Sequence, residues 1–104
     1  MAQFFLGYKG GEKPATPEAG KAMMAEWQAW VGELGDALVV AQQPLMGSKT
    51  LTSSGVEDGQ GPDPLSGYSI LEAEDMEAAL KIAKTCPFLK MNTARLQISQ
   101  LMGM

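Results

Sequence analysis

Alternating apolar residues open the chain and predict a β-strand over residues 2–8. Phe4, Leu6 and Tyr8 fall on one face of this segment, while Phe5 falls on the other. Period-two alternation is typical of a strand, and apolar side chains on both faces favour a central position in a sheet. We therefore expect this strand to lie in the middle of a sheet.

An amphipathic helix is predicted to begin at Pro17 and to end near Gly35. Thr16 suits the N-cap because its side-chain oxygen can accept a backbone N–H, and proline is favoured at the first helical position. At about 100° per residue, one face of this helix collects the large apolar residues. The members of this face are Gly20, Met23, Trp27, Trp30, Val31, Leu34 and Leu38. Such a face must pack against another part of the protein.

The middle of the chain predicts two short strands and one long loop. Residues 37–41 are apolar and partly β-branched, so they favour a strand that Pro44 interrupts. Residues 49–52 alternate and predict a short edge strand. Residues 53–66 are polar and rich in glycine and proline, and we expect a loop without regular structure.

A further strand is predicted over residues 67–73, followed by a helix that starts near Glu74. Acidic residues suit the first turn of this helix, and Pro87 stops it. The predicted buried stripe of the helix consists of Met76, Ala79, Leu80 and Ala83. A last strand over residues 93–100 has inward-facing Ala94, Leu96 and Ile98, with Arg95, Gln97 and Ser99 on its other face.

The resulting order is β-α-β-(β)-β-α-β, which predicts one α+β domain over residues 1–104. Two helices alternating with about four strands suit a ferredoxin-like βαββαβ fold, in which both helices cover one face of an antiparallel sheet. The other face of the sheet then needs cover. A second copy of the sheet is the expected partner.

The composition removes several classes of function. The 104-residue chain has 8 Lys and Arg against 12 Asp and Glu, a net charge of −4, one Cys and no His. There is thus no imidazole base, no His-ligated metal, no disulfide and no thiolate cluster. The basic residues are too few and too scattered for nucleic acid or an anionic membrane. We expect a cytoplasmic protein with no metal, no cofactor and no nucleic-acid or membrane partner.

The strand Gly67-Tyr68-Ser69-Ile70-Leu71-Glu72-Ala73, the helix after it and Cys86-Pro87-Phe88-Leu89 together form a distinctive unit. This unit resembles the strand-helix signature of the YCII-related domain family, in the branch often labelled DGPF, and the resemblance extends over nearly the whole chain. It implies a dimeric α+β barrel, in which two ferredoxin-like sheets pack face to face around a cleft. Some members are thought to be small-molecule enzymes with a His-Asp pair, and one relative is a dehydrochlorinase of a chlorinated aromatic.

The chain departs from this family at the positions that carry its chemistry. The His expected in the first helix is absent, and Glu26 or Trp27 occupies its neighbourhood. Cys86 stands where the family often has Asp or His before a proline, and residues 58–63 only partly match the acidic-Gly-Pro-Phe motif. We therefore expect the fold without the His-dependent chemistry.

Candidate site residues come from both predicted helices and from two strands. Glu26 is a candidate general base if it faces a cleft, with an exposed helix carboxylate as the alternative. Trp27 and Trp30 could stack on an aromatic ligand, but such a pair more often packs a helix on its sheet. Cys86 lies at a helix C-terminus with no His to take its proton, which favours a structural thiol.

Arg95 and Tyr68 are the candidates on the face of the sheet away from the helices. The Arg95 guanidinium, together with Tyr68, Gln97 and Ser99, could bind an anionic small molecule or pair with a carboxylate of a partner subunit. The sequence leaves these two roles open.

The sequence therefore predicts a YCII-related protein that binds a small organic molecule in an inter-subunit cleft. The predicted ligand-binding residues are Trp27, Trp30, Tyr68, Cys86 and Arg95. One alternative is a small-molecule lyase or isomerase, with Glu26 as base and Arg95 or Tyr68 stabilising negative charge. Another alternative is a purely structural or protein-interaction module.

Overall fold

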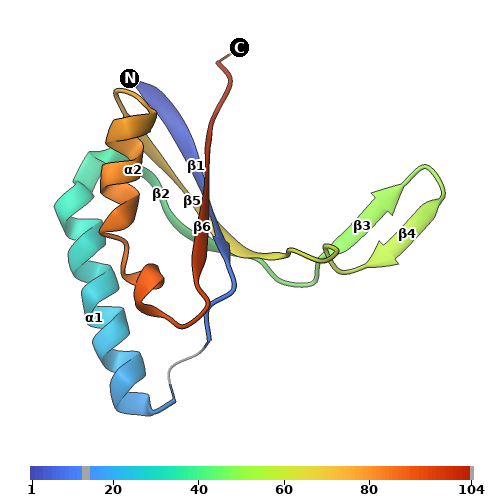
Figure 1. The fold of residues 1–104 in the computed structure, drawn as a ribbon, viewed down its shortest axis with the longest axis horizontal. Coiled ribbons are helices and arrows are strands. Elements are labelled where there is room, and N and C mark those ends of the chain that lie inside the picture. Colours follow the sequence, from blue (N-terminus) through green and yellow to red (C-terminus); the bar gives the residue numbers. More distant parts are fainter. Residues whose placement is uncertain (13–14, 104) are drawn as a thin grey trace.

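A computed structural model describes residues 1–12 and 15–103 of the chain. Its centre is a four-stranded antiparallel sheet in the order β2-β5-β1-β6. The strands are β1 (Ala2–Lys9), β2 (Leu38–Pro44), β5 (Leu65–Ala73) and β6 (Arg95–Gln100). Helices α1 (Pro17–Leu34) and α2 (Met76–Lys84) both cover one face of this sheet (Figure 1). The predicted ferredoxin-like α+β arrangement of the sheet and helices is confirmed.

The two faces of β1 differ as its alternating pattern predicts. Phe4, Leu6 and Tyr8 are buried beneath the helices, whereas Phe5 stacks on Tyr68 of β5 on the other face, with ring centroids 5.5 Å apart. The buried apolar residues of the described chain are Phe4, Leu6, Tyr8, Trp30, Leu38, Leu71, Ala73, Ala79, Ala83 and Cys86. The core therefore lies between the helices and one face of the sheet.

Helix α1 begins where its capping residues predict. The Ala19 N–H donates to Thr16 Oγ1 at 3.1 Å, and Pro17 is the first helical residue. The helix ends at Leu34, and a single 3₁₀ turn, η1 (Gly35–Ala37), leads into β2. Leu38 is thus buried as the first residue of β2 and not as part of the apolar face of α1.

The buried stripe of α2 is rotated from its predicted position. Ala79 and Ala83 are buried as predicted, but Met76 and Leu80 are 38% and 41% exposed. Partly buried Ala78 and Ile82 complete the packed face instead. The two alanines face the sheet, and their small side chains allow close approach, so the larger apolar residues lie at the margin. A short 3₁₀ helix, η2 (Pro87–Lys90), follows α2.

The prediction of a loop over residues 53–66 is wrong, because part of this segment forms a hairpin. Strands β3 (Lys49–Thr52) and β4 (Gly55–Asp58) pair with each other and do not join the main sheet. Gly55 ends the turn between them with a φ of 138°. A residue with a side chain would adopt this backbone conformation only with strain. The edge strand predicted at residues 49–52 has the correct bounds but pairs outside the main sheet, and this hairpin projects from the body (Figure 1).

The last strand, β6, starts at Arg95 and alternates as predicted. Leu96 and Ile98 pack against the core, while Arg95 and Gln97 are exposed on the opposite face.

None of the helices described is long and apolar enough to cross a membrane.

Candidate functional site

A small apolar pocket opens between the N-terminal half of α1, the end of β2 and η2. Its volume is about 310 Å³. The described residues that line it are Gly20, Met23, Met24, Trp27, Gln42, Phe88 and Met91. We call it the Trp27 pocket. None of these side chains is ionisable, and Gln42 supplies the only polar one.

An aromatic cluster joins the Trp27 pocket to the core. The Tyr8 ring lies edge-on to the Trp27 ring, with the two centroids 5.6 Å apart. The centroids of the Tyr8 and Phe88 rings are 5.0 Å apart. Trp27 also contacts Trp30, whose indole Nε1–H donates to Thr85 Oγ1 at 2.8 Å. Trp30 is therefore a buried core residue with its polar atom satisfied, whereas Trp27 is partly exposed and presents a face to the pocket.

The hydroxyl of Tyr8 is held in a buried hydrogen-bonded chain. Ser69 Oγ donates to the Ala41 carbonyl at 2.5 Å, so Tyr8 is left to donate its own proton to Ser69. Burial raises the pKa of the Tyr8 phenol well above its ordinary value, although the hydrogen bond with Ser69 acts in the opposite direction. The phenol is therefore neutral at physiological pH and fixes the position of the ring between Trp27 and Phe88.

Cys86 lies in the core, next to this cluster. Burial raises the pKa of its thiol to about 11, which keeps it protonated and a poor nucleophile at neutral pH. Cys86 is not among the residues that line the Trp27 pocket. These features favour the structural role, and its predicted contact with a ligand stays a prediction.

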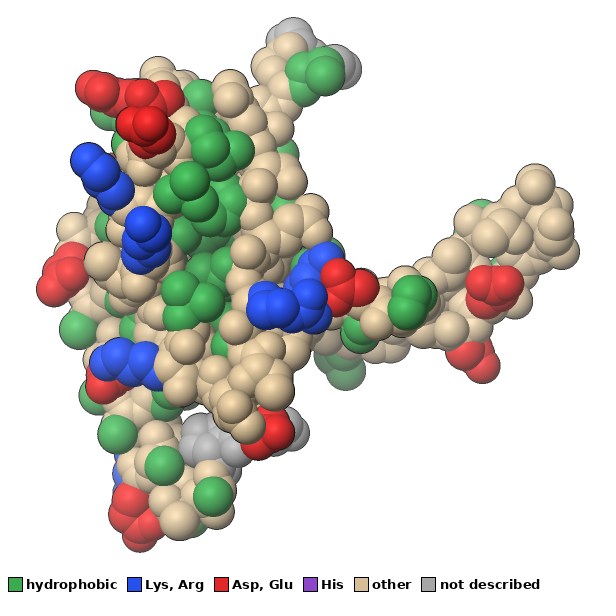
Figure 2. Space-filling view, in the orientation of Figure 1, with side chains coloured by type: hydrophobic (Ala, Val, Ile, Leu, Met, Phe, Trp, Pro, Cys, Tyr) green, Lys and Arg blue, Asp and Glu red, His purple; other side chains and the backbone are tan. Residues whose placement is uncertain are grey.

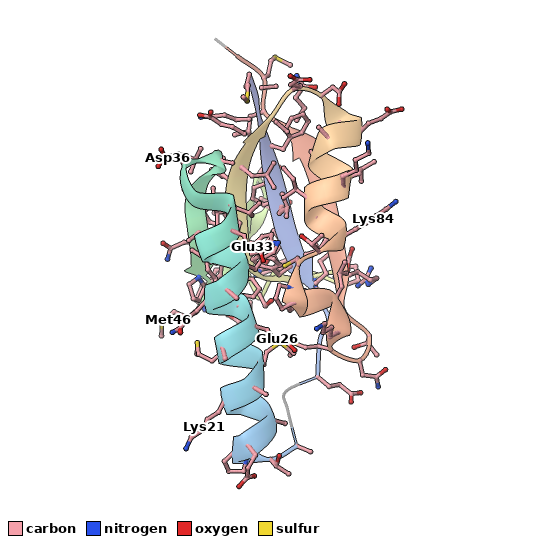
Figure 3. The ribbon with its side chains drawn as sticks, turned by 90° about the vertical axis from the view of Figure 1, so that its left-hand side faces the viewer. Lys21, Glu26, Glu33, Asp36, Met46 and Lys84 are labelled. Atoms are coloured by element: carbon pink, nitrogen blue, oxygen red, sulfur yellow. The ribbon has the colours of Figure 1, made fainter. Side chains whose placement is uncertain are left out.

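Glu26 lies on α1 beside η2 (Figure 3). Its Oε2 accepts from Lys90 Nζ at 3.0 Å, and 44% of its side chain is exposed. Glu26 does not line the Trp27 pocket either. This ion pair matches the alternative of an exposed helix carboxylate, and a catalytic role for Glu26 remains untested.

Tyr68 and Arg95 lie on the face of the sheet away from the helices, which we call the open face. Arg95 Nη2 donates to Asp63 Oδ1 at 2.8 Å, and Lys9 Nζ donates to Asp63 Oδ2 at 2.6 Å. The hydrogen bond from Lys9, followed by that from Arg95, holds the pKa of the Asp63 carboxyl below its ordinary value. Both contacts are ion pairs. Figure 2 shows basic side chains next to an acidic one at the base of the projecting hairpin.

The structure divides the predicted ligand-binding residues between the two faces of the sheet. Trp27, Trp30 and Cys86 lie on the helix side, whereas Tyr68 and Arg95 lie on the open face. They do not form one site within a single chain. Among the described residues, no three Cys, Asp or Glu side chains are grouped so that they could hold a metal ion.

Of the residues that line the Trp27 pocket, sequence reasoning identified only Trp27 as a ligand-binding candidate; it assigned Gly20 and Met23 only to the apolar face of α1, and it missed Met24. Gln42, Phe88 and Met91 were missed for another reason. Each comes from an element other than α1, so no periodic pattern links it to Trp27. The only indirect signal for any of them was that Phe88 is the aromatic residue of the segment Cys86-Pro87-Phe88-Leu89, which carries part of the family resemblance.

Comparisons with known proteins add little to the description of this site. No family model matches the chain, and no curated protein matches it. Among solved structures, the chain is similar to 5-chloro-2-hydroxyhydroquinone dehydrochlorinase from Burkholderia phenoliruptrix AC1100, in complex with 2,5-dihydroxybenzoquinone. The sequence identity is 18%, 90% of each chain is covered, and the TM-score is 0.49. No residue role is transferred from that enzyme.

Proposed function

We propose that this protein binds a small, uncharged, flat organic molecule in the Trp27 pocket. The observation that carries the proposal is the lining itself: thioethers and aromatic rings surround the space, and one amide stands among them. A volume of about 310 Å³ is at the small end of the usual range of ligand pockets, about 300–1,000 Å³.

The chemistry of the lining sets the class of ligand. A charged group in this pocket would lose its hydration without meeting an opposite charge, which is costly. Trp27 and Phe88 present ring surfaces that suit an aromatic ligand, and Met23 and Met91 can adapt to its outline. The Gln42 amide can donate one hydrogen bond and accept another. A phenol or a quinone-like ring has the matching shape and polarity.

Two glycines in α1 provide a matched test of this binding. Gly20 lines the pocket and Gly32 does not, and a Cβ at either position meets no atom within 4 Å. Gly20→Phe should fill the pocket and abolish the binding of 2-naphthol in isothermal titration calorimetry, while Gly32→Phe should leave the affinity unchanged. The 2-naphthoate anion should bind at least about tenfold more weakly than 2-naphthol.

The proposal fails if 2-naphthol binds Gly20→Phe as tightly as it binds the natural sequence. Because phenylalanine favours a helix more than glycine does, neither variant should unfold α1. A circular dichroism spectrum equal to that of the natural sequence checks this point.

We further propose that the chain is a YCII-related protein and that it forms a homodimer through the open face. Phe5, Tyr68 and Ile70 form an apolar patch at the centre of that face. A sheet that is apolar on both faces is normally covered on both. Sedimentation equilibrium at micromolar concentration should give twice the mass of one chain, and a monomer would contradict the proposal.

Neither of the two alternatives gains support from the contacts around the Trp27 pocket. A lyase or isomerase with Glu26 as base would need this carboxylate beside the ligand, but it pairs with Lys90 outside the lining. A purely structural module would fit a pocket filled by side chains, and the Trp27 pocket has room for a ligand. A ligand-binding protein without the family's His-dependent chemistry therefore remains the function that the geometry supports best.

A further inference from the structure

The open face carries opposite charges at its two ends. At one end, Glu72 of β5 lies beside Gln3 of β1, and at the other end Lys9 of β1 lies beside Arg95 of β6. Asp63 neutralises one of the two positive charges, so that end keeps a net charge of +1. The apolar patch lies between the ends. The open face is therefore complementary in charge to the open face of a second copy whose strands run in the opposite direction.

The β3–β4 hairpin, residues 49–58, projects from the positive end of the open face like an arm (Figure 1). Leu51 and Val56 are paired directly across it, with exposures of 78% and 63%. An isolated two-stranded hairpin gains little stability in water, and apolar side chains exposed on it favour a binding partner. The arm also widens the molecule: the radius of gyration is 15.1 Å, against about 13 Å for a compact chain of this length.

The base of the arm is fixed to the body by several hydrogen bonds. The Gln60 amide donates to Ser48 Oγ at 3.0 Å and to the Leu65 carbonyl at 2.8 Å, and its Oε1 accepts from the Leu65 N–H at 3.0 Å. Asp63 adds its ion pairs to Lys9 and Arg95. These contacts hold the direction of the arm before any partner binds, which lowers the entropy cost of docking.

The area of the open face indicates why a second copy needs the arm. Four strands at about 4.8 Å spacing, each about 20–30 Å long, give a flat footprint of about 400–600 Å². A stable interface usually buries about 800 Å² per partner. In a two-fold dimer, each chain contributes its own arm and also receives the arm of its partner, and these two contacts supply the missing area.

We infer that the arm docks on a second copy of this chain whose strands run antiparallel to those of the first across the two open faces. This inference rests on the homodimer proposed above and adds its geometry. The antiparallel arrangement places Glu72 of each copy over the positive end of the other. It also brings each arm to the end of the partner's sheet where the chain termini lie (Figure 1). A hollow of about 500 Å³ lies there, lined in part by Met1, Leu101 and Met102.

Charge substitution on the arm tests whether it docks. Leu51→Glu combined with Val56→Glu should raise the dimer dissociation constant at least about tenfold in sedimentation velocity runs, because two buried apolar contacts per arm become charged. The control, Ala22→Glu with Ala29→Glu on the exposed side of α1, adds the same charge and should leave the constant unchanged. An unchanged constant in the arm variant overturns the inference while the proposed homodimer stands. A monomer in the natural sequence would refute both.

Cross-linking tests where the arm docks. A chain with Leu51→Cys is mixed with a chain with Leu101→Cys, and a short bis-maleimide is added; native Cys86 is buried and should stay unreactive. The expected product is a cross-linked pair containing one chain of each kind. A Leu51→Cys chain that cross-links only with itself would place the two arms at the same end, and would overturn the antiparallel arrangement.

Discussion

Burial decides the chemistry of Tyr8 and Cys86, two titratable side chains in or next to the aromatic cluster behind the Trp27 pocket. Both Tyr8 and Cys86 have pKa values raised chiefly by burial, so both are neutral at physiological pH. A neutral phenol and a neutral thiol can orient and pack neighbouring groups, but they do not supply a nucleophile or a base. At the residue scale, the site is therefore suited to binding more than to acid-base catalysis.

The raised pKa of Cys86 predicts a loss of stability in alkaline solution. The folded thiol has a pKa of about 11 against an ordinary value of 9.0, so folding favours the protonated form. The protonated thiol therefore contributes about 2–3 kcal/mol to the free energy of unfolding. This contribution is complete below about pH 9 and is lost as the pH rises from about 9 to 11. Urea unfolding of the natural sequence and of Cys86→Ala over this range measures the difference. If both proteins lose stability in parallel, the thiol is not buried as described.

Single residues also show where sequence reasoning works. Trp27 could be predicted as a candidate because it lies on the repeating apolar face of α1 and its ring can stack on an aromatic ligand. Gln42, Phe88 and Met91 could not be predicted, since only the tertiary fold brings β2 and η2 next to α1. A ligand pocket made by three elements leaves no spacing signal in any one of them.

At the scale of elements, the capping residue of α1 was a more accurate guide than the apolar periodicity of α2. Thr16 marks the start of α1 as predicted. The predicted start of the second helix near Glu74 is two residues early, because α2 begins at Met76 and Asp75 is its N-cap, accepting from the Ala78 N–H at 2.9 Å. Periodicity misplaced the stripe of α2, because the helix turns its small alanines toward the sheet. The hairpin was missed because its second strand, β4, is only four residues long, is exposed throughout and begins with Gly55 in a glycine-rich segment that usually indicates a loop.

The corrected stripe of α2 leads to a stability prediction. Ala79 is fully buried, so Ala79→Leu should overfill the space between α2 and the sheet and lower the free energy of unfolding by about 1–3 kcal/mol. Leu80 lies at the margin, and Leu80→Ala should cost less than about 1 kcal/mol. Urea denaturation measures both values. A larger loss for Leu80→Ala than for Ala79→Leu would restore the stripe expected from the sequence.

At the scale of the whole molecule, the sheet separates two kinds of surface. The helix side contains the core and the Trp27 pocket, and the open face contains the apolar patch, the charged ends and the base of the arm. The element order predicted the ferredoxin-like arrangement because strands and helices alternate clearly along the chain. The alternation of the strands also predicted that Tyr68 and Arg95 lie on the face away from the helices, and the registers of β1, β5 and β6 agree. It could not predict the Trp27 pocket, since that depends on how α1, β2 and η2 pack together.

The most direct test of the central claim is an NMR titration of the ¹⁵N-labelled protein with 2-naphthol. The chain has two indole N–H signals, from Trp27 and Trp30, which can be assigned with a Trp27→Phe variant. We predict a large, saturable shift of the Trp27 signal and a much smaller one for Trp30, whose N–H is bonded to Thr85. The absence of a Trp27 shift at millimolar 2-naphthol, or shifts confined to the open face, would contradict the assignment of the Trp27 pocket as the binding site.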